Sequence, residues 1–118
     1  MLAASFSLLI QAASLAQTAS ESMGFAAFEC ENFSANSPAR SGHSWVSGNA
    51  YAGFSGGGYM EALPADGATI IANPSTDSPE LQYAINFTTT GTYYLWMRGH
   101  AVGAGNMTVH AGLDGAPG

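Results

Sequence analysis

The strongest strand pattern of the chain lies in the stretch "ELQYAINFTTTGTYYLWMRG", residues 80–99. In its first half, Leu81, Tyr83 and Ile85 alternate with other residues, which is the period of a half-buried β-strand. The "TTTG" that follows suits a hairpin connection, because its glycine can take positive φ. Residues 92–99 are apolar on both alternating faces, so we expect a central strand there. Near its end, Arg98 is predicted to be structural, pairing with a carboxylate or with loop carbonyls.

Working outward, the pattern predicts further short strands separated by turns, and glycine is frequent, with 15 residues. Between the first two of these strands lies a stretch rich in Ser, Gly and Asn, residues 34–58, which is predicted to be one long loop. Many short strands with turn signals favour an antiparallel β-sandwich or jelly roll. The further strands are expected at "FAAFECENF" (25–33), "YMEAL" (59–63), "ATII" (68–71) and "MTVHAGL" (107–113).

Composition narrows the possible functions. The chain has 118 residues, enough for one folded domain, and 47% of them are hydrophobic. Two basic residues stand against eight acidic ones, for a formal net charge of -6. A surface so poor in cations offers no electrostatic footprint for nucleic acid or anionic lipid. Low charge combined with many aromatic, Ser, Thr and Gly residues is common in secreted all-β domains.

The first residues resemble a targeting segment. An apolar run covers residues 3–15, and small residues follow around 16–20, as in a signal peptide with its cleavage site. The run is shorter than the roughly 20 residues that a membrane-spanning helix needs. No Lys or Arg precedes it, and the alternative is a buried helix. We therefore expect a leader at 1–22, a folded domain at 23–118, and a secreted, extracellular or periplasmic location without a membrane anchor after leader removal.

Cys30 is the chain's one cysteine, so no disulfide framework can form within the chain. In the predicted strand it alternates with Glu29 and Glu31, and we expect a buried, inert thiol. The two glutamates would leave the same face of the strand. Two close carboxylates suit an oxygen-seeking cation such as Ca²⁺, while solvated glutamates at a sheet edge are the alternative.

Catalytic motifs are weak. "GFSGG" (53–57) matches the G-x-S-x-G elbow, but Ser55 precedes glycines and a strand rather than a helix, and nothing places a histidine beside it. The same long loop carries Trp45 and Tyr51 among polar residues, a composition that suits sugar binding by ring stacking and hydrogen bonds. The alternative is that these aromatic side chains pack into the core and hold the loop in place.

Four segments together resemble carbohydrate-binding module families 6 and 35. "FECENF" resembles their "EAE" first strand, and "GFSGGGYMEAL" resembles their "GYSGTGYV" segment. "PELQYAINFTTTGTYYLWMRGHA" resembles their hairpin, and "MTVHAGLDG" resembles the strand that ends in "V-x-L-D-G". The resemblance implies a galactose-binding-like jelly roll of two antiparallel sheets that binds polysaccharide without catalysis.

By region, the resemblance implies that sugar contacts come from Trp45, Tyr51, His100 and Asn106. It also implies a structural calcium held partly by Glu29 and Glu31. The family continues beyond "LDG" with further strands, so we expect the sandwich to be incomplete here and the chain to be a fragment of a longer protein.

Three functions remain open. The first is polysaccharide or oligosaccharide binding by a secreted module, linked covalently to catalytic or surface domains in a longer parent. The second is a structural or adhesive sandwich that serves as a spacer without a sugar site. The third is a piece of a glycoside hydrolase or lyase whose active site lies elsewhere. The residues present contain no catalytic constellation, which favours the first two.

Overall fold

The computed structural model describes residues 17–39, 41–67, 70, 72–101, 109–114 and 116–117. Strands dominate the described residues, with one helix of a single turn, so the chain is all-β as expected. The elements are β1 (Thr18–Ser20), β2 (Ala35–Ser37), β3 (Ser44–Gly48), β4 (Tyr59–Leu63), α1 (Pro74–Asp77), β5 (Glu80–Gln82), β6 (Ala84–Asn86), β7 (Gly112–Leu113) and β8 (Ala116–Pro117).

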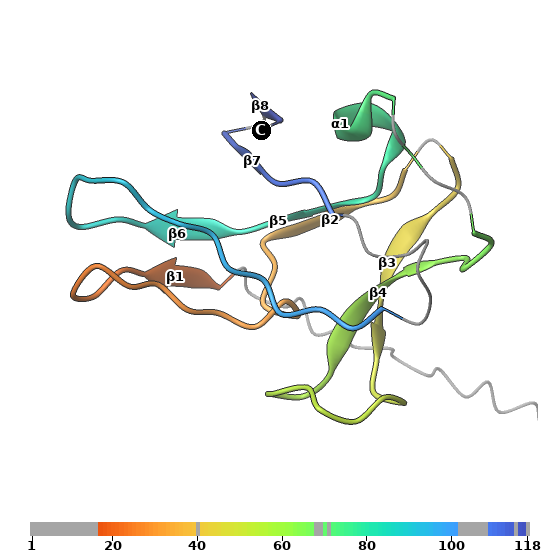
Figure 1. The fold of residues 1–118 in the computed structure, drawn as a ribbon, viewed down its shortest axis with the longest axis horizontal. Coiled ribbons are helices and arrows are strands. Elements are labelled where there is room, and N and C mark those ends of the chain that lie inside the picture. The colour runs from red at the N-terminus through yellow and green to blue at the C-terminus, as the bar shows by residue number, and fades with distance from the viewer. Residues whose placement is uncertain are drawn as a thin grey trace, which may run out of the picture.

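The described strands pair two by two (Figure 1). The longest ladder is antiparallel and joins β3 to β4, with Ser44 opposite Leu63 and Gly48 opposite Tyr59. β2 pairs antiparallel with β5, β7 pairs antiparallel with β8, and β1 lies parallel to β6. Stacking of larger sheets into a sandwich remains a prediction.

β1 is anchored through the residue that follows it. The Glu21 carboxylate accepts hydrogen bonds from the Gly24 N–H at 2.5 Å, from the Thr88 N–H at 3.0 Å and from the Thr89 N–H at 3.1 Å. The hydroxyls of Thr88 and Thr89 donate to the same carboxylate. These donors, with the Thr88 hydroxyl first and the Gly24 N–H next, lower the pKa of Glu21 to about 2. Residues 18–20 of the expected leader therefore pair with β6, and Glu21 contacts residues 88 and 89 just after it, whereas residues 1–16 lie outside the described chain.

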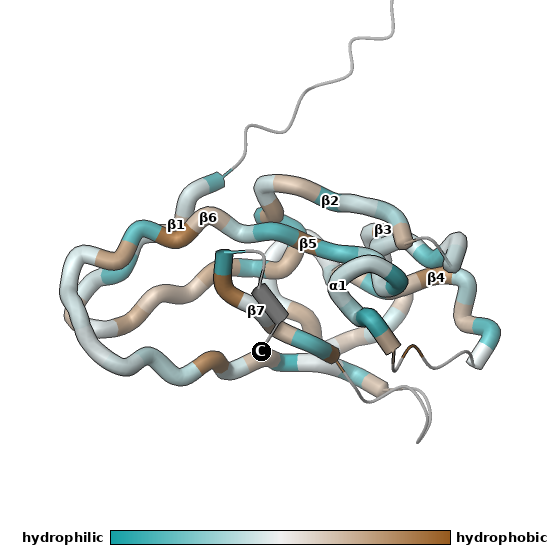
Figure 2. The backbone as a smooth tube through the Cα atoms, turned by 90° about the horizontal axis from the view of Figure 1, so that it is seen from above, coloured by the Kyte–Doolittle hydropathy of each residue, from teal (hydrophilic) through white to brown (hydrophobic). Residues whose placement is uncertain are grey.

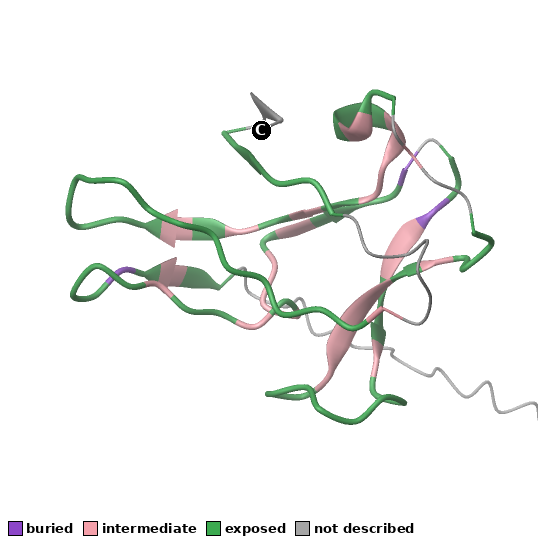
Figure 3. Cartoon of the chain, viewed as in Figure 1, coloured by how far each residue is buried: buried purple, intermediate pink, exposed green. Residues whose placement is uncertain are grey.

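Few side chains are buried. Among the described residues, Glu21, Ala39 and His43 are buried (Figure 3). Figure 2 shows hydrophobic and hydrophilic residues interspersed along the described tube, without a continuous apolar layer. The expected apolar core is thus not formed by the described residues, and large apolar side chains such as those of Tyr94 and Trp96 face solvent.

Two predicted strands are found. Residues 59–63 form β4 with the predicted bounds. The alternating stretch 80–87 forms β5 and β6, separated at Tyr83, and its Leu81 and Ile85 are more buried than the residues beside them. The period-two pattern in residues 80–87 therefore located β5 and β6 and the face of each strand that is less exposed.

Other strand predictions were wrong. Residues 25–33 form no strand and are irregular apart from an isolated bridge at Phe25 and a turn at 30–31. Cys30 is exposed instead of buried because no strand face turns it inward. Residues 92–99 form no strand and are exposed throughout. The stretch 34–58 is not one loop, since it contains β2 and β3.

Two predictions reach beyond the described residues. The expected strand 68–71 lies outside them except for Ile70, which is not in a strand. Of the expected strand 107–113, residues 107 and 108 lie outside, 109–111 are irregular, and Gly112–Leu113 form β7.

Candidate functional site

The β3–β4 hairpin carries the candidate site on the loop that joins its strands, residues 49–58. Two glycines allow this loop to close. A Cβ atom on Gly48 would lie 2.6 Å from the Tyr59 ring, and one on Gly58 would lie 2.6 Å from the Gly48 carbonyl oxygen. Both contacts are shorter than real Cβ atoms make. The missing side chains therefore let the Tyr59 ring lie directly over the backbone of β3.

Aromatic rings gather around this loop. The Tyr51 ring centroid lies 5.8 Å from that of Tyr59 and 5.2 Å from that of His100, and Phe54 lies 6.0 Å from Tyr59. These distances are typical of interacting rings. Tyr51 remains 43% exposed, so part of its surface is open to a ligand. We call Tyr51, Phe54, Tyr59 and His100 the loop site.

The segment after β6 completes the loop site. It runs back from the tip at 88–91 toward the β3–β4 hairpin (Figure 1). There the Arg98 guanidinium donates through Nη2 to the Gly53 carbonyl, which confirms the expected structural role of Arg98. Because this bond ties residue 98 to the loop, it also holds His100 beside Tyr51.

Two carboxylates lie against the glycines of the same loop. Glu31 Oε1 accepts the Gly57 N–H at 3.0 Å, and Glu29 Oε2 accepts the Ser55 hydroxyl at 3.0 Å. A Cβ atom on Gly56 would lie 2.6 Å from Glu31 Oε1, so the bare backbone is what admits the carboxylate. Backbone N–H groups, its own first and then that of Gly57, lower the pKa of Glu31 against the opposing effect of desolvation. Glu31 is therefore ionised at neutral pH.

A hollow of about 340 Å³ adjoins the loop site. Polar groups and one aromatic ring line it: Glu31, Ser47, Gly48, Asn49, Gly57, Gly58 and Tyr59. An amide, a hydroxyl and a carboxylate beside an aromatic ring can bind a molecule that has both hydroxyl groups and an apolar face.

A second hollow, of about 300 Å³, lies near β1 and contains the ring pair of Phe28 and Tyr83, whose centroids are 4.8 Å apart. The Tyr83 hydroxyl donates to the Cys30 carbonyl at 2.8 Å, and burial is the main cause that raises its pKa to about 12. Since this phenol is already bonded within the protein, Tyr83 serves to pack the turn at 30–31, and we place the candidate site at the other hollow.

The predicted sugar-contact residues have different positions. Tyr51 and His100 meet in the loop site. Trp45 lies in β3 opposite Ala62, toward the far end of the ladder, and its indole N–H donates to the Pro79 carbonyl at 2.9 Å. Asn106 lies outside the described residues. Sequence reasoning did not single out Tyr59, because its packing over Gly48 is a contact across the hairpin that the sequence does not show.

The expected calcium ligands, Glu29 and Glu31, lie against the same glycine loop. The carboxylates of Glu29 and Glu31, two positions apart in sequence, both contact the loop 49–58. The Ser55 hydroxyl is a third oxygen at this place. Calcium takes six to eight oxygens. Within the described ranges, no group of three or more acidic, histidine or cysteine side chains converges. Calcium binding by Glu29 and Glu31 stays a prediction.

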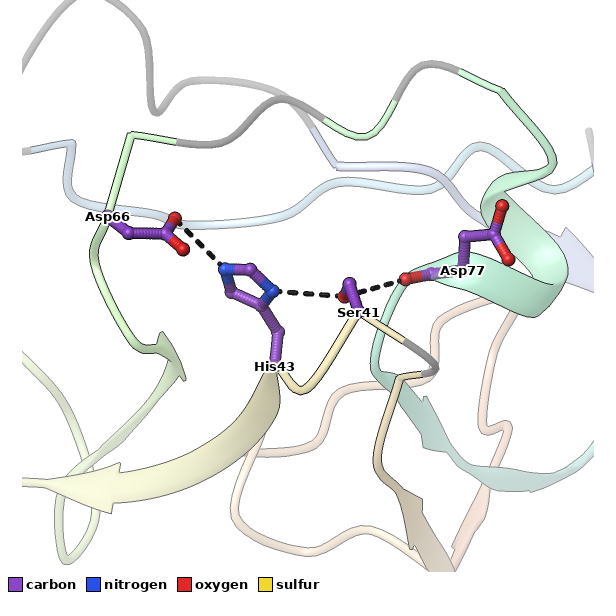
Figure 4. Close-up of polar contacts among 4 residues, drawn as sticks. All are labelled: Ser41, His43, Asp66 and Asp77. Atoms are coloured by element: carbon purple, nitrogen blue, oxygen red, sulfur yellow. Dashed lines mark hydrogen bonds and ion pairs between the residues drawn. The ribbon is translucent and has the colours of Figure 1, made fainter.

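Ser41, His43 and Asp66 form a polar chain at the other end of the hairpin (Figure 4). His43 Nε2 lies 3.1 Å from Asp66 Oδ1, and its Nδ1 lies 3.0 Å from the Ser41 hydroxyl oxygen. The Ser41 hydroxyl also donates to the Asp77 carbonyl at 3.0 Å. The Ser41 hydroxyl thus lies within hydrogen-bond distance of both the His43 ring and a backbone carbonyl. The contacts therefore join the turn before β3, the loop after β4 and the end of α1.

In the part of the chain that the structure describes, no helix has the length and apolar character to cross a bilayer. Comparisons with protein-family models, with curated proteins and with solved structures found no match to this chain.

Proposed function

We propose that this chain is part of a non-catalytic carbohydrate-binding module of a secreted protein, and that it forms an incomplete jelly-roll sandwich. One observation carries the proposal. Tyr51 and His100, two residues expected on sequence grounds to contact sugar, come from distant segments, and their ring centroids lie 5.2 Å apart beside the hollow that Glu31, Asn49 and Tyr59 line.

The chemistry of this surface suits a sugar. A pyranose ring has an apolar C–H face and a rim of hydroxyl groups. The exposed face of Tyr51 accepts the C–H face, while Asn49 and Glu31 supply an amide and a carboxylate for hydroxyl groups. With few charges on the chain, affinity would come from stacking and hydrogen bonds rather than from long-range attraction.

A structural or adhesive spacer is the second candidate. Its supporting observation is the exposed apolar stretch at 93–97, in which Trp96 is 90% exposed. Exposed apolar surface of this extent marks contact sites in many proteins. A spacer of this kind needs no loop site, so the two candidates differ in where substitutions matter.

Affinity electrophoresis in gels cast with a panel of plant, algal and fungal polysaccharides tests the proposal, with and without calcium. We expect at least one polysaccharide to retard the protein and Tyr51→Ala to abolish the retardation. Tyr94→Ala is the matched control, because it removes an equally large exposed ring outside the loop site. No retardation by any polysaccharide would support the spacer instead. Equal loss of retardation in both variants would contradict sugar binding at the loop site.

A further inference from the structure

Given sugar binding at the loop site, we infer that this site selects glycans of amino sugars, whose ammonium group Glu31 holds beside the Tyr59 ring. The inference rests on the proposed function and narrows its ligand to cationic glycans. It follows from the charges and contacts around the hollow, taken one at a time.

The wall of the hollow carries a fixed negative charge. Glu31 lines the hollow, and its Oε1 is held by the Gly57 N–H at 3.0 Å. Its Oε2 contacts the Cys30 thiol at 3.6 Å, and a thiol is a weak donor. This second oxygen therefore keeps the capacity to accept a strong hydrogen bond from a ligand.

The surroundings of Glu31 favour a cationic ligand. The chain contains no lysine, and Glu29 adds a second carboxylate on the same glycine loop. Arg98, the basic residue among the described ones, donates to the Gly53 carbonyl instead of neutralising Glu31. An anionic sugar would meet repulsion here, and a neutral sugar could offer the carboxylate hydrogen bonds but no opposite charge.

The aromatic rings add to this preference. Tyr59 lines the same hollow as Glu31, and Tyr51 lies 5.8 Å from Tyr59. Aromatic faces attract ammonium groups by about 0.5–1 kcal/mol at exposed sites. A carboxylate and a tyrosine in one hollow thus provide both groups that recognise a protonated amine, while Tyr51 stacks on the sugar ring.

Calorimetric titration with a matched pair of ligands tests the inference: a glucosamine hexamer and a glucose hexamer with the same β-1,4 linkage. Both are measured in EDTA at mildly acidic pH, where the sugar amines are protonated. We expect the glucosamine hexamer to bind roughly tenfold more tightly, corresponding to one exposed ion pair with a cation–π contact. Glu31→Gln keeps an acceptor for Gly57 but removes the charge, and should make the two affinities equal.

Glu80→Gln is the control for non-specific attraction, because it removes the same charge from an exposed residue at the start of β5. This variant should retain the tenfold preference. Equal binding of the two hexamers by the unchanged protein, still sensitive to Tyr51→Ala, would overturn the amino-sugar inference and leave the proposed function standing. Binding of neither these hexamers nor any polysaccharide would contradict both. A preference reduced equally by the two glutamine variants would show non-specific attraction and overturn the inference.

Discussion

The β3–β4 hairpin and residues 92–99 are both rich in aromatic and other apolar residues. The hairpin consists of two paired strands, whereas residues 92–99 are not paired. β3 and β4 pair over five residues each, and the indole N–H of Trp45 reaches the Pro79 carbonyl. Residues 92–99 form no strand, and Trp96 is 90% exposed. The difference teaches that a strand pattern becomes a strand only when a neighbouring strand supplies hydrogen bonds and a surface to pack on.

The largest expected effect breaks the paired region. Gly58→Ala places a Cβ atom 2.6 Å from the Gly48 carbonyl oxygen, and this backbone atom cannot rotate away. We expect the free energy of unfolding to fall by about 1–3 kcal/mol, measured by urea denaturation. Gly91→Ala is the control, because an added Cβ there meets nothing within 4 Å. Equal stability of the two variants would contradict the hairpin geometry.

The second prediction concerns the effect of acid on stability through Glu21, whose carboxylate binds residues 88 and 89 just before the segment that forms no strand. The pKa of Glu21 is lowered to about 2, because Thr88, Gly24 and Thr89 donate to the ionised carboxylate. The stability that these bonds contribute is present above the ordinary pKa of about 4.5 and is lost as pH falls toward 2. Thermal melts between these pH values should show a falling Tm, and Glu21→Gln should flatten this part of the curve. An unchanged slope in that variant would refute the anchoring role of Glu21.

The smallest effects compare the two tryptophans. Trp45→Phe removes the bond to the Pro79 carbonyl and should lower the free energy of unfolding by about 1 kcal/mol. Trp96→Phe should change it by less than about 0.5 kcal/mol, because the ring is exposed. Denaturation of the two variants side by side checks this order, and a larger loss at Trp96 would mean that residues 92–99 are packed.

The strands that were predicted correctly are those that a local residue pattern determines. Residues 80–87 alternate in hydrophobicity, residues 59–63 form a short, mostly apolar stretch after glycines, and both stretches form strands. Residues 44–48 were assigned to a loop because Ser, Gly and Asn surround them, yet pairing with β4 makes them a strand. That pairing is a long-range contact, which a local pattern does not contain.

The candidate site was predictable in part. Tyr51 and His100 were expected to contact sugar by region, from the resemblance to carbohydrate-binding modules, and the structure brings them together. The contribution of Tyr59 depends on its packing over Gly48, and that of Glu31 depends on the bare backbone at Gly56. Tyr59 meets Gly48 across the hairpin loop, and Glu31 meets Gly56 from a segment distant in sequence. Only the structure shows these two contacts.

Hydrogen exchange of the backbone amides, followed by mass spectrometry with and without a saturating glycan, tests the central claim most directly. That claim is that the loop joining β3 and β4 binds the glycan while residues 92–97 do not. The account predicts slower exchange in peptides covering 49–58 on binding, with no change in those covering 92–97. Protection confined to 92–97, or unchanged exchange at 49–58 in a protein that demonstrably binds the glycan, would contradict it.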